Sequence, residues 1–496
     1  MTNQRPSISV LLRSYIAVII LAFLLSSCGI IIINRPDEQS DTGDWSTGEQ
    51  TTDGTTVTTK VPKSTEDKKK MAQYYVDNLP DYDMKNMSIL ISAVDKKTLI
   101  IDDEDNSLSK ARHRRYSMLE KKYGVNIIVT SNDVDTIFQE LKDSIASGMY
   151  YADLLMLPSE SVGSFYAGNY LLNIMSLPYV FLDEPYFNEE SVLQSTAGYN
   201  VYAVSGDAVL NPDYIYGVFF NFDLAARLDM GNPYELVYKG EWTWDVYRAM
   251  AKAIAYDLNG IATGIGGHGA QSVDRSYSDM VLGSTGIKYL STGWGQMPVL
   301  NEPGEQHERI SALLYSLLYE DKTLYKRETH LEAFANKGLL FYTGPLLTMH
   351  TLSDSAARWG ILPLPKIDQA QSGYRSPVTK EMPVFAVPAN NSRLSETGLV
   401  LQSLNAASYG YLTDEYITYA MNYVVRDNDT LNMIDIIANS ASFDFALMFG
   451  SGYSALGKAT YDALFSSINS KASYRTFYNS YANAAVSQIN AAFPVK

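Results

Sequence analysis

The chain has 496 residues, of which 46% are hydrophobic, and a formal net charge of −16. Such an acidic protein is a poor partner for nucleic acid or anionic lipid, and neither is expected as its main ligand. One cysteine, Cys28, allows no internal disulfide, so stability must come from a large core. The length suits two or three domain-sized lobes.

The N-terminus has the layout of a secretory signal peptide. Arg5 and Arg13 supply positive charge, Tyr15–Leu25 is an apolar run, and two serines precede Cys28. The sequence from Leu25 to Cys28 resembles the lipobox of bacterial lipoproteins, in which the cysteine thiol is lipidated and the chain is cut just before it. This resemblance implies a signal peptide over 1–27 and a palmitate-type anchor at Cys28.

An alternative for this segment stays open. Residues 15–33 could form an uncleaved membrane-spanning helix of about 19 residues, near the usual minimum. Both interpretations place the rest of the chain outside the membrane, as the positive-inside rule expects. We therefore expect the protein on the extracellular face of the cell membrane, in a Gram-positive envelope. Residues 34–70 are rich in polar and charged residues, and 28–70 are predicted to be a lipid-anchored flexible linker, with the folded body beginning near Met71.

The first part of the body alternates between strand and helix patterns, which predicts parallel pairing with right-handed crossovers. The predicted strands are 87–94, 125–130 and 152–157, and the predicted helices are 107–123 and 134–147, ended by Gly124 and Gly148. The basic residues between Lys110 and Lys122 are interpreted as a solvated helix face.

Fewer elements are clear in the second part. Strands are predicted at 218–221, 339–343 and 383–387, a helix at 243–255, and mostly helices after Glu396. Residues Gly264–Gly269 fit the pattern GxGxxG, but no suitable second strand follows. We interpret them as a glycine-rich loop after a short strand, with no nucleotide cofactor.

Catalytic and metal-binding motifs are missing from the sequence. The five histidines are scattered without an HExxH pair, and no GxSxG turn occurs. We therefore expect no enzyme activity, no cofactor and no metal site.

Several blocks together resemble the family 1 extracellular solute-binding proteins, the substrate receptors of bacterial ABC importers. The blocks are "YADLLMLPSESVGSFYAGNYLLNI" (151–174), "VFFNFDLAARLDMGNPYELVYKGEWTWDVYRAMAKAI" (218–254), "LLFYTGPLLTM" (339–349), "WGILPLPK" (359–366) and "RDNDTLNMIDII" (426–437). They occur in the family's order and cover most of residues 87–450.

The resemblance implies an α/β, two-lobed, periplasmic-binding-protein-like (type II) fold with hinge-linked lobes and an interlobe cleft. Lobe 1 would comprise 71–213 and 378–426, and lobe 2 would comprise 214–377 and 427–496. It also implies a monomer that binds a small polar ligand, a sugar or oligosaccharide, by lobe closure and delivers it to ABC permease subunits. Maltose-type receptors place a stacking Trp after the block at 343–345 and an Asp-Arg pair near 159–161. This chain has neither.

Candidate ligand-binding residues are those at expected strand ends or crossings, and aromatic residues that could stack on a sugar ring. Ser159 and Glu160 follow a strand, although a helix cap would explain them equally well, and Asp207 could instead be a turn residue. Helical phase predicts that Trp244 packs inward and leaves Trp242 for stacking. The full set is Ser159, Glu160, Asp207, Trp242, His268, Trp294, Tyr374, Arg375 and Asp444.

Two other functions remain open at this point. A lipid-anchored enzyme acting on polysaccharide would need two carboxylates about 5–10 Å apart, and the 55 acidic residues allow such a pair. A sensor module on the same binding fold would lack a permease.

Overall fold

The structure is a computed structural model that describes residues 45–52, 55–62, 65–94, 96–99, 106–227, 231–257, 265–326, 329–423 and 427–493. The chain divides into two compact units, 1–61 and 62–496. Before residue 65, strands β1 (Trp45–Thr52) and β2 (Thr55–Pro62) form a two-stranded sheet. The predicted signal peptide over 1–27 and the predicted lipidation site Cys28 lie outside the described residues.

The linker prediction for 28–70 is wrong at two places. Strands β1 and β2 lie inside it, and β2 is rich in Thr and Val, whose branched side chains suit strands. Helix α2 (Thr65–Asn78) also starts there, because its first turn is fastened to helix α16 (Tyr411–Tyr423). Thr65 donates to Asp414 at 2.9 Å, and Lys68 forms an ion pair with the same carboxylate at 2.6 Å.

The first sheet of the body has the strand order β15-β5-β3-β4. Strands β3 (Ser88–Ala93), β4 (Asn126–Ser131) and β5 (Leu154–Pro158) are parallel, which confirms the predicted pairing, and β15 (Pro383–Ala386) is antiparallel to β5. Helices α3 (Ser107–Tyr123) and α4 (Val134–Ser147) end at Gly124 and Gly148, both with φ near +70°. Both helices begin and end where the sequence predicts.

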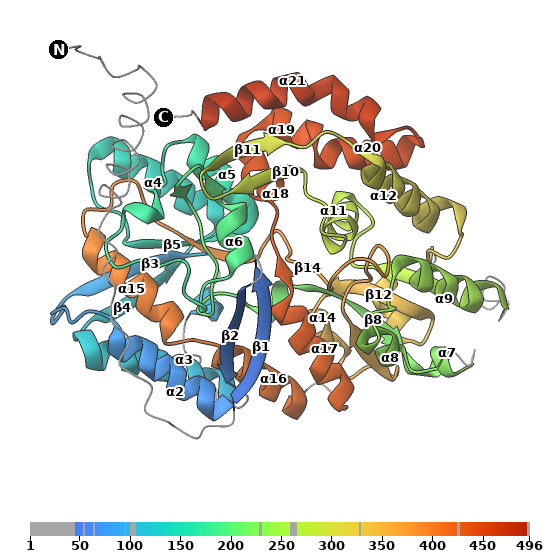
Figure 1. Ribbon diagram of the computed structural model, residues 1–496, viewed down its shortest axis with the longest axis horizontal. Helices are drawn as coiled ribbons and strands as arrows, with labels where there is room; N and C mark the ends of the chain where they lie inside the picture. Colours follow the sequence, from blue (N-terminus) through green and yellow to red (C-terminus); the bar gives the residue numbers. More distant parts are fainter. Residues whose placement is uncertain are drawn as a thin grey trace, which may run out of the picture. The chain divides into compact units, whose positions relative to one another are not determined.

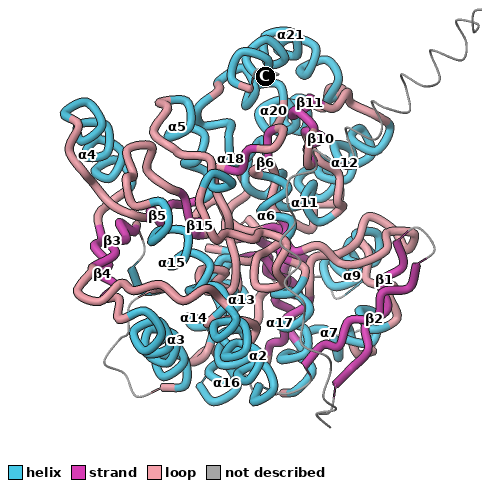
Figure 2. Tube along the Cα trace, turned by 60° about the vertical axis from the view of Figure 1, so that its left-hand side comes forward, coloured by secondary structure: helices cyan, strands magenta, loops and turns pink. Residues whose placement is uncertain are grey.

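Helices α2, α3 and α16 pack together beside this sheet (Figure 2). The interpretation of the basic residues on α3 as a solvated face is wrong for Arg115, which is fully buried. Its guanidinium donates to the carbonyl oxygens of Thr98, Leu99 and Ala208, and these acceptors allow a charged group to be buried there.

The second sheet has the order β13-β8-β12-β9. Its strands are β8 (Tyr216–Asn221), β9 (Gly266–Ala270), β12 (Leu339–Pro345) and β13 (Trp359–Leu362). The predicted glycine-rich loop is therefore strand β9, which pairs in parallel with β12. A Cβ at Gly267 would lie 2.4 Å from the carbonyl oxygen of Ala251, so glycine lets the strand approach helix α9 (Trp244–Asp257).

Three chain segments cross between the two sheets side by side. The Thr379 amide donates to the Tyr214 carbonyl at 2.7 Å, and the Val378 amide donates to the Ser442 carbonyl at 3.1 Å. Strand β14 (Ser376–Pro377) pairs in parallel with β16 (Ala441–Ser442). The predicted lobe boundaries at 213/214 and 377/378 lie at two of these segments, whereas the predicted boundary at 426/427 borders residues outside the described part of the chain. The division into lobes stays a prediction.

The C-terminal helices contact α11 (Arg275–Ser284) and α12 (Glu305–Tyr315) and also reach α5 (Val162–Ala167), which follows the first sheet's strand β5. Helix α20 (Tyr461–Ser470) packs on α11 and α12, and α21 (Tyr474–Ala492) runs along α19 (Ser454–Ala459) and α20 (Figure 1). At α5, Tyr166 stacks on Phe493 with ring centroids 4.9 Å apart.

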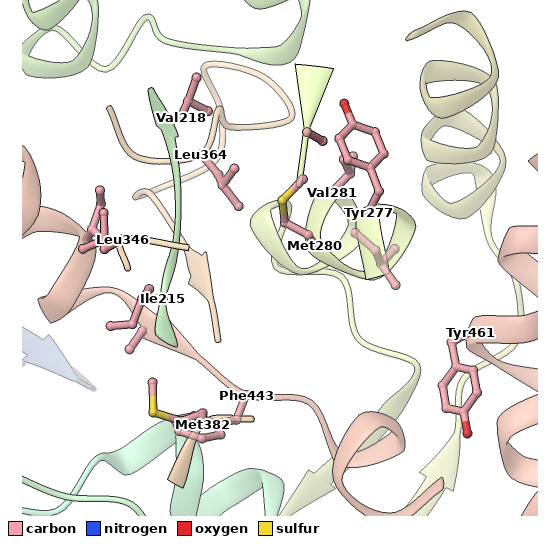
Figure 3. Packing of buried hydrophobic residues seen from close by; sticks show 14 of the residues in the cluster. Ile215, Val218, Tyr277, Met280, Val281, Leu346, Leu364, Met382, Phe443 and Tyr461 are labelled. Atoms are coloured by element: carbon pink, nitrogen blue, oxygen red, sulfur yellow. The ribbon is translucent and has the colours of Figure 1, made fainter. Parts of the chain in front are cut away.

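The largest hydrophobic cluster extends from the second sheet to these helices. Figure 3 shows part of it, with Tyr277, Met280 and Val281 on α11 and Tyr461 on α20. In the described part of the chain, no helix combines the length and the apolar character needed to cross a bilayer.

Candidate ligand-binding cleft

A cleft of about 720 Å³ lies where the two sheets and the crossing segments meet. It is lined by residues after the carboxyl ends of β5, β9 and β12, and by residues before β8 and β15. This is where open α/β sheets generally bind their ligands, and the volume is within the range of small-molecule sites.

Ser159 and Glu160 lie at this cleft, directly after β5. The Ser159 amide donates to the Met382 carbonyl at 2.9 Å, and its hydroxyl lies 3.2 Å from the Lys380 carbonyl oxygen. The Glu160 carboxylate is 3.5 Å from the Lys380 ammonium. The crossing segment therefore holds both residues at the cleft, and ligand contact by them stays a prediction.

Asp444 also lines the cleft and caps the short helix α18 (Phe445–Phe449). Its carboxylate accepts from the Ala446 amide at 2.8 Å and the Leu447 amide at 3.4 Å. Burial raises the pKa of Asp444, although Lys288 and the capping amides oppose the shift. Its role as a helix cap and its place at the cleft are compatible.

Sequence reasoning missed Asp279, a buried carboxylate of the cleft. It lies on α11, is 8% exposed, accepts from the Tyr289 hydroxyl at 3.0 Å and lies 3.6 Å from the Arg275 guanidinium. Burial raises the pKa of Asp279 to about 7, against the lowering effect of Arg275. The sequence gives one signal, an acidic residue inside an otherwise buried helix segment.

The aromatic wall of the cleft consists of tyrosines and one phenylalanine, and includes none of the predicted tryptophans. It comprises Tyr214, Tyr216, Tyr289, Phe443 and Tyr461. The Arg275 guanidinium lies over the Tyr461 ring, 4.1 Å from its centroid, so this wall already faces one cation.

The prediction that Trp242 stacks on a ligand is contradicted by its burial. Trp242 is 0% exposed, and its indole N–H donates to the Pro363 carbonyl at 2.8 Å. Its ring contacts Phe341 and Tyr247 in the core. Trp244 is also buried, as predicted. The Trp242 indole points inward because the chain before α9 lies against the second sheet, which helical phase alone does not reveal.

Trp294 is 52% exposed and lies in the turn between β10 (Leu290–Gly293) and β11 (Gln296–Leu300). Its ring meets Tyr199 at a centroid distance of 5.6 Å. It does not line the cleft, so the structure does not bring it together with Glu160 and Asp444.

Asp207 and His268 lie away from the cleft. The Asp207 carboxylate accepts a hydrogen bond from the Gly410 amide at 2.6 Å, and burial raises the pKa of Asp207 to about 7. The structure therefore favours the alternative in which Asp207 is a turn residue. His268 is fully buried on β9, with Nε2 3.0 Å from the Leu317 carbonyl oxygen. Burial lowers the pKa of His268 to about 4. No ligand can reach it, which corrects the prediction.

Tyr374 and Arg375 line a second cavity, of about 510 Å³. The Tyr374 hydroxyl donates to the Val237 carbonyl at 3.1 Å, and the Arg375 guanidinium lies 3.6 Å from Glu190. The structure thus places these two residues apart from the main cleft. Across the residues that the structure describes, no three His, Cys, Asp or Glu side chains gather in a way that could hold a metal ion.

No protein-family model matches the sequence, and no match is found among curated proteins. Among solved structures, a cyclo/maltodextrin-binding protein complexed with maltotetraose matches with a TM-score of 0.54 at 13% identity, covering 81% of this chain and 97% of that one. A Listeria monocytogenes ABC substrate-binding protein in complex with cycloalternan matches with a TM-score of 0.49 at 11% identity, covering 83% and 100%. Maltose-bound MalE3 of T. maritima matches with 0.48 at 14%, covering 81% and 99%.

The similarity to the maltodextrin-binding protein shows the fold. The chain has the two-lobed α/β fold of that cyclo/maltodextrin-binding protein, which confirms the fold class that the sequence blocks predicted. The cleft described above lies where the two sheets of that fold meet.

Proposed function

We propose that this chain is a solute-binding receptor that captures a sugar or oligosaccharide in the 720 Å³ cleft and delivers it to an ABC permease. The cleft itself is the observation that supports the proposal most strongly. It offers carboxylates for sugar hydroxyls and tyrosine rings for the apolar faces of sugar rings, at the place where ligands bind in open α/β folds.

Capture would proceed by closure of the lobes. Ser159 and Glu160 come from the end of the first sheet, whereas Arg275 and Asp279 come from α11, which follows the second sheet's β9. A ligand that contacts both groups favours the closed arrangement by its differential affinity for it. The crossing segments at 376–382 and 440–444 would serve as the hinge.

The anchor belongs to the same proposal. The lipobox-like sequence ending at Cys28 would attach the mature chain to the outer face of the membrane, where a receptor could meet both its solute and its permease. A monomer is sufficient for this role, because the cleft is formed by one chain.

A thermal-shift screen of the mature chain tests the binding function. Oligosaccharides, amino acids and peptides would be compared, and a ligand at 100 times its dissociation constant adds about 2.7 kcal/mol to the free energy of unfolding. We expect stabilisation by at least one oligosaccharide. A shift with peptides or amino acids only would contradict the carbohydrate assignment.

One observation supports a second candidate, a glycan-cleaving enzyme. Asp279 and Asp444 share the cleft, and burial raises the pKa of Asp279 to about 7, a value suited to a general acid. Incubating the protein with each oligosaccharide that binds, followed by chromatography of the products, separates the two functions. The receptor proposal predicts intact ligand, and cleavage that Asp279→Asn abolishes would establish the enzyme.

A further inference from the structure

We propose that the ligand of the cleft carries a positively charged amino group, as an oligosaccharide of unacetylated amino sugars does. This inference deepens the proposed function and rests on it. It follows from the excess of carboxylates that line the cleft and from the ion pairs that the cleft's basic residues already form.

Carboxylates outnumber cations in the cleft wall, all of which belongs to the described part of the chain. The acidic residues are Glu160, Asp213, Asp274, Asp279, Glu381 and Asp444, and the basic residues are Arg275, Lys288 and Lys380. The wall therefore has an excess of three negative charges when all nine groups are ionised. Neighbouring tyrosine rings present further negative faces.

The three cations are already paired, and two of them are shared with carboxylates outside the cleft. The Lys288 ammonium is 2.5 Å from Glu190 and donates to the Phe443 carbonyl. The Arg275 guanidinium lies 3.6 Å from Asp279 but also 3.7 Å from Asp462. Neither Glu190 nor Asp462 lines the cleft. The cations therefore neutralise less of the cleft's negative charge than their number suggests.

Lys380 is the third cation and is half-exposed. Its ammonium lies 3.5 Å from Glu160 and 3.9 Å from Glu381, so one cation serves two carboxylates. Lys380 is thus engaged by Glu160 and Glu381, and the cations that act on Asp279 and Asp444 are Arg275 and Lys288.

Asp279 and Asp444 are the groups that an added cation would help most. Asp279 is buried and Asp444 is partly buried, and removing an ionised carboxylate from water is unfavourable without a paired charge. The titratable groups that interact electrostatically with Asp279 are Arg275, Tyr289, Asp444, Asp462, Tyr216, Tyr461 and Tyr474. Only one of these is a cation, whereas an ammonium group of a ligand would interact favourably with the carboxylates of both Asp279 and Asp444.

An independent observation points to a polar ligand at the same place. The Thr379 side chain lines the cleft, is 4% exposed and has no hydrogen-bond partner for its hydroxyl among the described residues. A buried hydroxyl without a partner is unusual, because its desolvation is not compensated. A ligand hydroxyl or amino group in the cleft would supply that partner.

A neutral sugar would satisfy these groups only in part. Its hydroxyls can donate to carboxylates but do not offset their charge, so the mutual repulsion of Asp279 and Asp444 would persist in the complex. An ammonium group beside carboxylates and tyrosine faces gains from both charge pairing and cation–π contact. An amino sugar also has the apolar ring face that an aromatic wall can hold.

Isothermal titration of the mature chain with three tetrasaccharides tests the inference: the β-1,4 tetramer of glucosamine, its fully N-acetylated counterpart and maltotetraose. The first two differ only in the charge and acetylation of the amine. We expect the glucosamine tetramer to bind at least ten times more tightly than the acetylated one. Its affinity should also fall severalfold between 50 mM and 500 mM salt, because the interaction is between charges.

Matched variants locate the interaction. Asp279→Asn should weaken binding of the glucosamine tetramer at least tenfold and change binding of a neutral tetramer much less. Asp444→Asn should act in the same direction, and it should fold because Asn also caps helices well. Asp135→Asn, on an exposed part of α4, is the control and should change nothing.

The outcomes separate this inference from the proposed function. Equal or tighter binding of a neutral tetramer would overturn the amino-group inference and leave the sugar receptor in place. Tight binding of the glucosamine tetramer that neither Asp variant weakens would also overturn the amino-group inference, since the ligand's ammonium groups would then bind to other residues. Failure of the glucosamine tetramer to bind would overturn the amino-group inference, and failure of every oligosaccharide in the thermal-shift screen would contradict both proposals.

Discussion

Glu190 on helix α6 (Glu189–Gln194) and Lys288, in the segment before β10, form an ion pair with an N–O distance of 2.5 Å. The Arg375 guanidinium lies 3.6 Å from the same carboxylate. Glu190 precedes the first crossing segment, whereas both cations follow it, so this contact joins the two lobes beside the main cleft. It is therefore a contact that opening of the lobes would be expected to break.

Removing the charge of Glu190 should shift the lobes toward the open arrangement. We predict that Glu190→Gln weakens ligand binding severalfold and increases the radius of gyration of the ligand-free chain, measured by titration and X-ray scattering. Glu235→Gln, which removes an exposed i,i+4 pair with Lys239, is the matched control and should alter neither quantity. Unchanged affinity in Glu190→Gln would mean that the ion pair does not contribute to closure.

The raised pKa of Asp279 predicts a pH-dependent cost to stability. The pKa is about 7 in the folded state and about 4 in an unfolded chain, so the folded state binds more protons between these values. The contribution of Asp279 to the free energy of unfolding should therefore fall as pH rises from about 4 to 7. Without ligand, Asp279→Asn should be more stable than the wild type by about 1–3 kcal/mol at pH 8 and by much less at pH 5.

Denaturant unfolding at the two pH values measures this difference. A stability gain of the same size at pH 5 and pH 8 would show that the effect is not due to the charge of Asp279. A loss at both values would show that its hydrogen bond with Tyr289 outweighs the cost of its burial.

The two tryptophans predicted to stack on the ligand should now behave differently from one another. Trp242→Ala should lower the free energy of unfolding by about 3–5 kcal/mol, because it leaves a cavity beside Phe341 and Tyr247. Trp294→Ala should change it by less than about 1 kcal/mol, because its ring is half-exposed. Similar losses in both variants, measured by chemical denaturation, would contradict the assignment of Trp242 to the core.

The lipid anchor is tested through Cys28. In cells of a Gram-positive host, Cys28→Ala should give an unprocessed precursor that cannot be labelled with a clickable fatty acid. The wild-type chain, expressed in parallel, should be labelled and shortened. Labelling that survives the substitution would place the attachment at another residue.

Local signals in the sequence were sufficient for the elements around the first sheet. Helix α3 ends at Gly124 because a left-handed residue stops a helix wherever the rest of the chain lies, and the same holds for Gly148. Such signals depend on neighbouring residues alone, and the helix ends predicted from them are confirmed. Ser159 and Glu160 could be predicted at the cleft because they follow a short strand, which again is a local property. Asp444 was predicted there from the family resemblance, as the position after the long helices.

The remaining site residues depend on contacts between distant parts of the chain. Trp242 and Arg115 are buried by segments far away in the sequence, and nothing near them reveals this. Asp279 lies in a buried helix that mixes serines with apolar residues, so nothing near it in the sequence marks it as a cleft residue. Its meeting with Asp444 and Tyr289 arises only when α11 packs against the C-terminal helices.

The most direct test of the receptor account is X-ray scattering of the mature chain with and without a tetrasaccharide that binds in calorimetry. The account predicts a smaller radius of gyration at saturation, because the ligand contacts residues from both lobes and favours closure. The Glu190→Gln variant should start from a larger radius and reach the same final value. A radius that is unchanged when the ligand saturates the cleft would contradict closure as the mechanism of capture.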